Sequence, residues 1–180
     1  TTGDQHTALG QNALFSNSTG NSNTALGSDS MYTNTTGHGS VAIGRGALYS
    51  NTSGINNIAI GPYSAASATA ALFSNTTGSY NIALGKGALH SNTTAANNTA
   101  VGYQAGYANT TGNENTFLGN KAGKSVTTGA DNTFVGSEAG DSNTTGGSSV
   151  AVGKGALQAN TTASNNTALG SQAGYSRTGS

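Results

Sequence analysis

The chain contains no cysteine, one proline and few charges: six basic and six acidic residues among 180, with a net charge of zero. Without cysteine it can form neither disulfides nor thiolate metal sites. The balanced, scattered charges provide no basic surface for nucleic acid or for an anionic membrane. No apolar run approaches the ~20 residues of a membrane span. We therefore expect neither nucleic-acid binding nor membrane insertion within this segment.

Hydrophobic and aromatic residues are also scarce, at 33% and 6%. A chain so rich in Asn, Thr, Ser and Gly would, without periodicity, be read as a disordered linker. Its periodicity argues otherwise. A glycine closes a five-residue motif that is clearest at Ser40-Val41-Ala42-Ile43-Gly44, and this glycine recurs as Gly10, Gly27, Gly44, Gly61, Gly85, Gly102, Gly119, Gly136, Gly153 and Gly170. Neighbouring glycines are 17 residues apart except once, where 85 − 61 = 24. Such a fixed period indicates a stacked repeat array.

The motif predicts a short strand. If its glycine is position 0 of each coil, position −3 is always β-branched and position −1 is always aliphatic. This alternation, bounded by Asn and Gly, is typical of a strand with one face inward. The fold class predicted is all-β, a parallel β-solenoid or β-roll of about ten 17-residue coils, roughly 50 Å long at about 4.8 Å per coil. We expect positions −3 and −1 to fill its lumen, with the −1 core column formed by Leu9, Leu26, Ile43, Ile60, Leu84, Val101, Leu118, Val135, Val152 and Leu169.

A second strand is expected a few residues after the glycine. Position +3 is small, position +4 is Leu, Met or Gly, and position +5 is mostly aromatic, as in Phe15, Tyr32 and Tyr49. In a stack of coils these rings would form a ladder along one side. We interpret the ladder as packing of like on like rather than as a ligand-binding strip.

Two phenylalanines indicate how the interior is filled. Position −2 is alanine in every coil except at Phe117 and Phe134, and those two coils have Gly123 and Gly140 at +4. The coil before them has Gly106 at +4. A large residue where others have been removed suggests that −2 and +4 share a space of constant volume.

Residues 1–180 are interpreted as a single repeat array whose register runs from Gly10 to Gly170. The seven additional residues form an insertion within 62–70, and the repeat resumes at Ala71. The array begins and ends within a repeat, so we expect a fragment or subunit of a longer fibre. Each coil satisfies the backbone of its neighbours, which leaves the two ends as unpaired edges.

The turn between coils reads Asn-Thr-Thr-Gly or close to it, and Asn and Gly are residues that tolerate the positive φ of tight corners. The same turn repeats the Asn-x-Ser/Thr sequon of N-glycosylation. The candidate glycosylation sites are Asn17, Asn34, Asn51, Asn75, Asn92, Asn109, Asn143 and Asn160, and Asn97 and Asn165 add two more. The alternative, which we prefer, is that Asn and Thr are present because they stack well in turns.

No catalytic, cofactor-binding or metal-binding residues are predicted. His6, His38 and His90 lie in three different columns, and no histidine or carboxylate has metal-ligand spacing. Gly-x-Gly fragments such as Gly44-Arg45-Gly46 lack the following helix that a phosphate loop needs. We therefore expect a protein that is not an enzyme and that needs no cofactor.

The Ser40–Gly44 motif resembles the head repeat of YadA-like trimeric autotransporter adhesins. The Asn-Thr-Ala-Leu-Gly motif with Asn-Thr-Thr-Gly turns is similar to repeats of phage tail-fibre and related surface-fibre proteins. The resemblance runs from His6 to Ser180, although the 17-residue period is longer than that of the adhesin repeat. It implies a parallel β-roll, three chains side by side, and a role in adhesion or in holding a tip away from a surface.

The apolar columns independently suggest self-association. They occur at positions of both parities, and successive strand residues face opposite sides, so some must point outward and need a cover. We predict a non-enzymatic structural or adhesive rod, associating with itself laterally or end to end as a homotrimer or filament. A host-surface glycan or protein is a further candidate partner. The expected location is extracellular, at a cell surface or on a virion fibre.

The alternative is a protein that recognises an ordered surface, such as ice or a glycan lattice, through stacked Thr and Asn. Two adjacent threonine columns support it, although adjacent residues alternate faces and only one column can lie flat on a given side. The first of these columns is Thr35, Thr52, Thr76, Thr93, Thr110, Thr127, Thr144 and Thr161.

Overall fold

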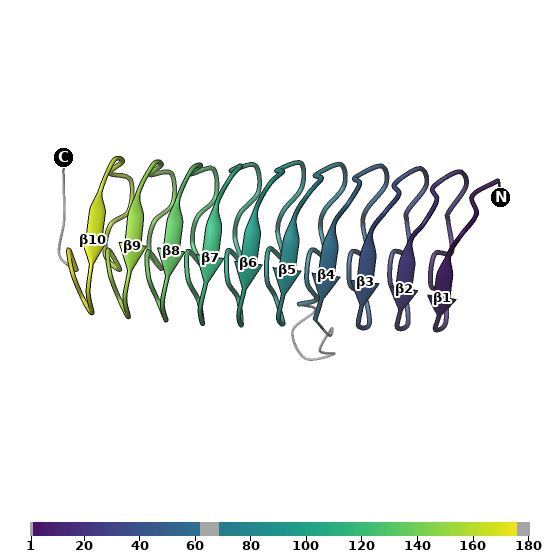
Figure 1. The fold of residues 1–180 in the computed structure, drawn as a ribbon, viewed down its shortest axis with the longest axis horizontal. Coiled ribbons are helices and arrows are strands. Elements are labelled where there is room, and N and C mark those ends of the chain that lie inside the picture. The colour runs from purple at the N-terminus through teal and green to yellow at the C-terminus, as the bar shows by residue number, and fades with distance from the viewer. Residues whose placement is uncertain (1, 62–68, 176–180) are drawn as a thin grey trace.

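The computed structural model describes residues 2–61 and 69–175. These residues form ten three-residue strands and no helix. The strands are β1 (Thr7–Leu9), β2 (Thr24–Leu26), β3 (Val41–Ile43), β4 (Ile58–Ile60), β5 (Ile82–Leu84), β6 (Thr99–Val101), β7 (Thr116–Leu118), β8 (Thr133–Val135), β9 (Val150–Val152) and β10 (Thr167–Leu169). They pair in parallel and in chain order, and Figure 1 shows them side by side along the long axis. The predicted all-β parallel solenoid with its 17-residue period is confirmed.

The register is kept across the one irregular interval. Ile58 of β4 pairs with Ile82 of β5, 24 residues on, as regularly as Val41 pairs with Ile58. Most of the insertion predicted within 62–70 lies outside the described residues. Its last two members, Thr69 and Ala70, are buried, and the column resumes with buried Ala71 and Leu72 as predicted.

The predicted −1 core column is wrong, because the strands present their other face to the lumen. The middle residue of each strand, at −2, points inward, and Ala25, Ala42 and Phe117 are fully buried. Positions −3 and −1 point outward; Leu9 is 67% exposed and Leu118 is 46% exposed. In a three-residue strand the outer two side chains share one face and the middle one takes the other. The residues that line the outside are Leu9, Leu26, Ile43, Ile60, Leu84, Val101, Leu118, Val135, Val152 and Leu169.

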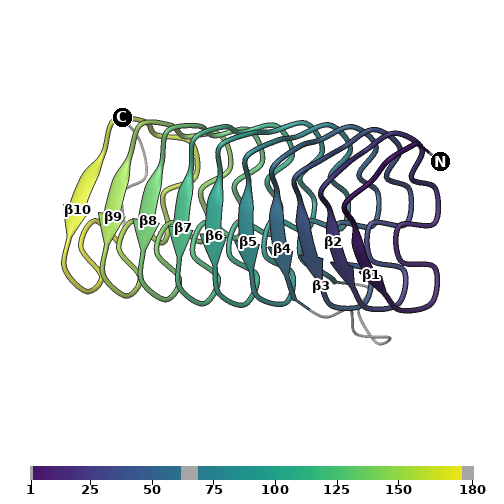
Figure 2. The ribbon, with the colours of Figure 1, turned by 45° about the vertical axis from the view of Figure 1, so that its right-hand side comes forward.

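The predicted second strand is also wrong, because that segment is a pair of left-handed turns. Asp29 at +2 has φ 58° and Met31 at +4 has φ 50°, and the pattern recurs in coil after coil. The alternation of strand faces is thereby lost, so +3 and +4 can both point inward. Bonds between coils continue nevertheless, as from Leu48 N–H to the Ala71 carbonyl at 3.1 Å. Figure 2 shows the strands forming one wall of the coil, with the turn segments behind them.

The lumen is therefore filled mainly by the +4 side chains, opposite small residues at −2. Met31, Leu48, Leu72, Leu89 and Leu157 are at most 1% exposed. The narrow space explains why −2 is nearly always alanine.

The predicted exchange of volume between −2 and +4 is confirmed. A Cβ on Gly140 would collide with the Phe134 ring, and one on Gly123 would collide with Phe117. The Phe117 ring also lies against Gly106 of the preceding coil. Each ring thus fills the space that a leucine occupies in other coils.

Two ladders of buried asparagine amides run through the corners of the coil. At position +7, Asn51 Nδ2 donates to Asn34 Oδ1 at 2.8 Å and to the Gly54 carbonyl at 2.9 Å, and both asparagines are fully buried. At position −4, Asn98 Nδ2 donates to Asn81 Oδ1 at 3.2 Å. The stack supplies most of these amides with a partner one coil away, which offsets the usual cost of burying a polar group. An exception is Asn109 Oδ1, which is buried without a hydrogen-bond partner.

The glycine at position 0 is required by close contact as well as by conformation. Gly27 has φ 133°, and a Cβ there would lie 2.6 Å from the carbonyl carbon of Gly44 in the next coil. The Asn-Thr-Thr-Gly corner itself does not use left-handed residues. The left-handed position lies two residues after it, at Asn56, Asn97 and their equivalents.

Candidate functional site: the outer face of the sheet

The outer face of the ten-stranded sheet carries an ordered set of exposed aliphatic and threonine side chains. It consists of positions −3 and −1 of every strand, and the parallel register places each side chain directly beside its equivalent in the next coil. Leu26, Ile60, Leu118 and Val150 are each more than a third exposed. The strand prediction identified these columns but assigned them to the wrong side.

This face forms one continuous surface along the rod. Ten strands at ~4.8 Å, each about 10 Å across, give roughly 500 Å² of flat β-branched and aliphatic surface. Position −3 is threonine in six of the ten strands, so the apolar part of this area is smaller and lies within the range of apolar patches that monomeric proteins leave uncovered. It could serve as one side of a contact with another surface of similar shape.

Charges of opposite sign flank the sheet face. Along one side runs position +1, which we call the post-glycine rim; its charged residues are Arg45, Lys86 and Lys154. Along the other runs position +12, the pre-strand rim, whose charged residues are Glu114 and Asp131, both exposed. Each rim therefore carries one sign only.

The predicted aromatic ladder is confirmed. Ring centroids of successive +5 residues are between 5.0 and 5.5 Å apart from Phe15 through His90 to Tyr107, with nearly parallel planes. Because each ring covers the next, only the ring edges and the two end faces of the ladder remain for a ligand. Burial of His90 between Phe73 and Tyr107 lowers the pKa of its imidazole.

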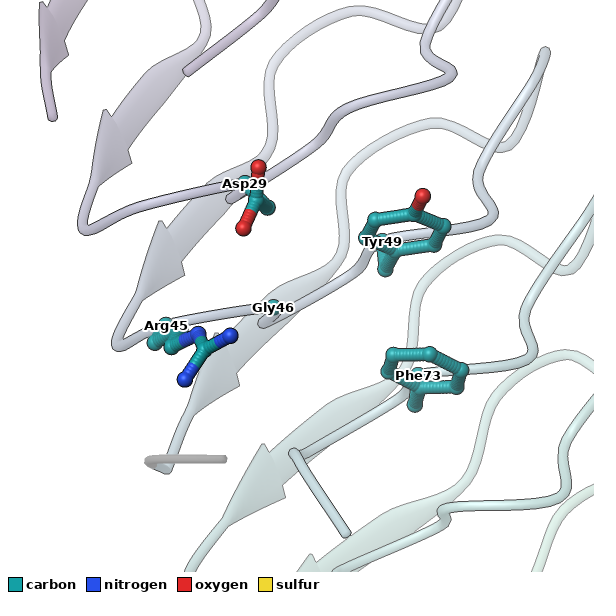
Figure 3. Close-up of a pocket in the computed structure, with 5 residues that line it drawn as sticks. All are labelled: Asp29, Arg45, Gly46, Tyr49 and Phe73. Atoms are coloured by element: carbon teal, nitrogen blue, oxygen red, sulfur yellow. The ribbon is translucent and has the colours of Figure 1, made fainter. Parts of the chain in front are cut away.

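A hollow of about 240 Å³ lies beside this ladder, lined by Asp29, Arg45, Gly46, Tyr49 and Phe73. Figure 3 shows the rings of Tyr49 and Phe73 parallel on successive coils, with Asp29 and Arg45 to one side. The Asp29 carboxylate accepts hydrogen bonds from Asn12 Nδ2 at 3.0 Å and Ser28 Oγ at 2.9 Å. These bonds, and more weakly the charge of Arg45, lower the pKa of Asp29. The hollow brings together no nucleophile and base.

The structure places all eight asparagines of the main sequon column inside the coil. Asn34, Asn51, Asn75, Asn92, Asn109 and Asn143 are fully buried, Asn160 is 1% exposed and Asn17 is 6% exposed. The Nδ2 atom that would carry a sugar donates to protein oxygens instead, as in Asn75 to Asn51 at 2.9 Å. A row of sugars at these candidate positions therefore does not fit the folded coil, whereas the preferred interpretation, in which Asn stacks in the turns, agrees with these contacts. Asn97 and Asn165 are exposed.

The two threonine columns differ in their surroundings. The first, at +8, is half-buried, and its hydroxyls donate to the next coil, as in Thr76 Oγ1 to the Thr93 carbonyl at 3.0 Å. The second, at +9, is exposed, as at Thr77 and Thr94. Only the second column therefore presents free methyl and hydroxyl groups to solvent.

The remaining candidate chemistry is dispersed. Within residues 2–61 and 69–175, no three His, Asp or Glu side chains lie close enough together to hold a metal ion. Asp131, Glu138 and Asp141 occupy different columns, and Glu138 Oε2 accepts from Gln158 Nε2 at 3.2 Å. The described part of the chain contains no helix long and apolar enough to cross a membrane.

Comparisons with known proteins return no matching family model, no similar curated protein and no similar solved structure.

Proposed function

We propose that this chain is a non-enzymatic structural rod of an extracellular fibre, a surface adhesin or a phage tail fibre, and that copies associate laterally through the outer face of the sheet. The observation that carries the proposal is the outward-facing row of aliphatic side chains at −1, which runs along all ten strands. Removing apolar surface from water lowers the free energy by about 25 cal/mol per Å², so a second surface that covers this face would be held there.

The charges of the two rims favour a second copy of the chain as the surface that covers the sheet face. If two sheet faces meet with their rods parallel, the cationic post-glycine rim of one copy lies opposite the anionic pre-strand rim of the other. If the rods are antiparallel, rims of like charge meet. Complementary rims select partner and orientation, so we propose that two rods pair face to face and run parallel.

The proposal is tested by sedimentation of two matched variants. Leu118→Lys places a charge on the sheet face, and Thr111→Lys places the same charge on the exposed +9 column. We expect concentration-dependent oligomers for the natural chain and for Thr111→Lys, and association weakened at least about tenfold for Leu118→Lys. A natural chain that stays monomeric at high concentration, and shows no fibres by electron microscopy, would refute lateral association.

A second candidate function is recognition of an ordered surface, a glycan lattice or ice. The exposed +9 column supports it, because Thr77, Thr94, Thr111 and Thr128 stand at regular intervals along the rod. A thermal-hysteresis assay tests binding to ice, and a glycan array tests binding to glycans. In each case Thr94→Lys with Thr111→Lys should abolish any signal, and Leu118→Lys should leave it intact.

A further inference from the structure

The C-terminal end of the rod contains an unfilled part of the core. A hollow of about 280 Å³ opens there, lined by Leu157, Asn166, Thr167, Ala168, Leu169, Ala173 and Gly174. We number each coil after its strand. The hollow arises because coil 10, the coil of β10, has small residues at both positions that fill the lumen: Ala168 at −2 and Gly174 at +4. The other coils have a large side chain at one of the two, apart from coil 6, with Ala100 and Gly106.

Coil 6 therefore shows how the lumen is filled when both positions are small and a further coil follows. Its residues 104–107 read Gln-Ala-Gly-Tyr, as do residues 172–175. The preceding coil supplies a leucine in both cases. Leu89 Cδ2 lies 3.0 Å from the position of a Cβ on Gly106, and Leu157 Cδ2 lies 2.8 Å from that position on Gly174. The two glycines have φ 59° and 64°. The space next to Gly106 and the space next to Gly174 are thus bounded in the same way on the side of the preceding coil.

The other side differs. In coil 6 the ring of Phe117, from position −2 of the next coil, lies against Gly106, with Cδ2 at 2.5 Å from the Cβ position. At Gly174 no described residue takes that place. The Phe117 ring also needs Gly123 at +4 of its own coil, where a Cβ would collide with it.

We propose that the C-terminal end of the rod is a socket for a further coil of the same repeat that carries Phe at −2 and Gly at +4, the arrangement of residues 115–123. Such a coil fills the hollow with its ring. It also provides acceptors for backbone donors: Gly106 N–H donates to the Ala122 carbonyl at 2.9 Å and Thr99 N–H to the Asn115 carbonyl at 2.8 Å. The equivalent donors of coil 10 belong to Gly174 and Thr167.

The first coil of a second copy fits this socket poorly. It presents Ala8 at −2, where the coil after coil 6 has Phe117. Its large residue is Leu14 at +4, but the leucines at +4 lean toward the following coil, as Leu89 and Leu157 do. Leu14 would therefore point away from Gly174 and leave the hollow empty. The proposal concerns the end of the rod and does not depend on lateral association through the sheet face.

The test is a cycle of four extended chains. A copy of residues 108–124 is placed directly after Tyr175, with its phenylalanine either kept or replaced by alanine, and each form is made with Gly174 and with Gly174→Leu. With Gly174, we expect the phenylalanine coil to slow amide exchange in β10 at least about tenfold more than the alanine coil. With Gly174→Leu the space is taken, so the advantage of phenylalanine should vanish or reverse.

Equal protection by the two coils in the Gly174 background would overturn the proposal. A second measurement does not depend on the added coil folding. In the unextended chain, Gly174→Leu should leave the thermal transition nearly unchanged or raise it, because Leu157 adopts φ 51° at the equivalent position of the preceding coil and the side-chain atom nearest to the new Cβ is the flexible end of Leu157, Cδ2. A large fall would count against the socket. End-to-end chains formed by Leu118→Lys protein, whose sheet face is blocked, would identify a second copy as the occupant and overturn the assignment.

Discussion

The ring of Phe117 occupies the space into which a side chain on Gly106, one coil earlier, would project; ring atom Cδ2 lies 2.5 Å from the position of a Cβ on Gly106. The pair shows that the lumen is filled across coils as well as within them. A change of side-chain size in one coil is therefore compensated in the neighbouring coil. This coupling can be measured with paired variants.

Phe117→Ala should lower the free energy of unfolding by about 3–5 kcal/mol, because it leaves a cavity in a fully buried column. Gly106→Leu alone should cost ~1–3 kcal/mol by overpacking against the ring. The double variant should lose less stability than the two single losses added together, because the leucine at 106 fills the space that the ring vacates. A leucine tolerates this backbone conformation: Leu48 has φ 55° and Gly106 has φ 59°. Urea unfolding of the four proteins gives the coupling energy; strict additivity would contradict a shared space.

Val126→Asn should stabilise the protein, although it places a polar residue at a fully buried site. Val126 interrupts the +7 amide ladder, and Asn109 Oδ1, in the coil before it, is buried without a hydrogen-bond partner. An amide at 126 would donate to that oxygen, a gain of about 1 kcal/mol or more. Val126→Thr, which keeps the shape but supplies no amide, should destabilise. The thermal transitions compare them, and a less stable Val126→Asn would show that the ladder contributes little here.

Stability should fall with decreasing pH because of His90. Burial in the aromatic ladder lowers the pKa of His90 from its ordinary 6.5, so the folded chain favours the neutral ring. Above pH 6.5 both folded and unfolded chains hold it neutral, and no penalty arises. As the pH falls from 6.5 through the lowered folded pKa, the unfolded chain takes up the proton first, and stability is lost.

His90→Tyr, which continues the ladder with a ring that does not titrate in this range, should remove that part of the pH dependence. Urea midpoints measured above and below pH 6.5 provide the comparison. An unchanged slope in the variant would place the titrating group elsewhere.

Reversing one charged rim should weaken lateral association, and reversing both should restore it. Arg45→Glu, Lys86→Glu and Lys154→Glu together give the post-glycine rim the same sign as the pre-strand rim, so parallel rods repel. Adding Glu114→Lys and Asp131→Lys recreates the complementarity with the signs exchanged. Sedimentation should show loss and recovery, both reduced at high salt. Association that is unchanged by the first reversal would contradict the parallel arrangement.

The register, the strand and the ladders could be predicted from residue spacing. Stacking places position n beside position n + 17, so every column of like residues is a contact between neighbours; this is why the Phe73–His90 stack and the pairing of Phe134 with Gly140 could be inferred without coordinates. The apolar character of the side chains at −1 and −3 was a poorer guide to which face of the strand is buried. Large apolar residues usually face a core, but here Leu9 and Ile60 face outward.

The amino-acid sequence by itself determined the period, the parallel stack and the exchange of phenylalanine for leucine across the lumen, since each follows from repetition and volume. Only the tertiary structure decided which face of the strand is inside. That choice depends on the left-handed residues at +2 and +4, which turn Met31 and Leu48 inward and leave room for no more than alanine opposite them. The same closure buries Asn51 and Asn75 beside equivalent amides, so the polar residues of the turn became part of the core and the aliphatic residues of the strand became the surface.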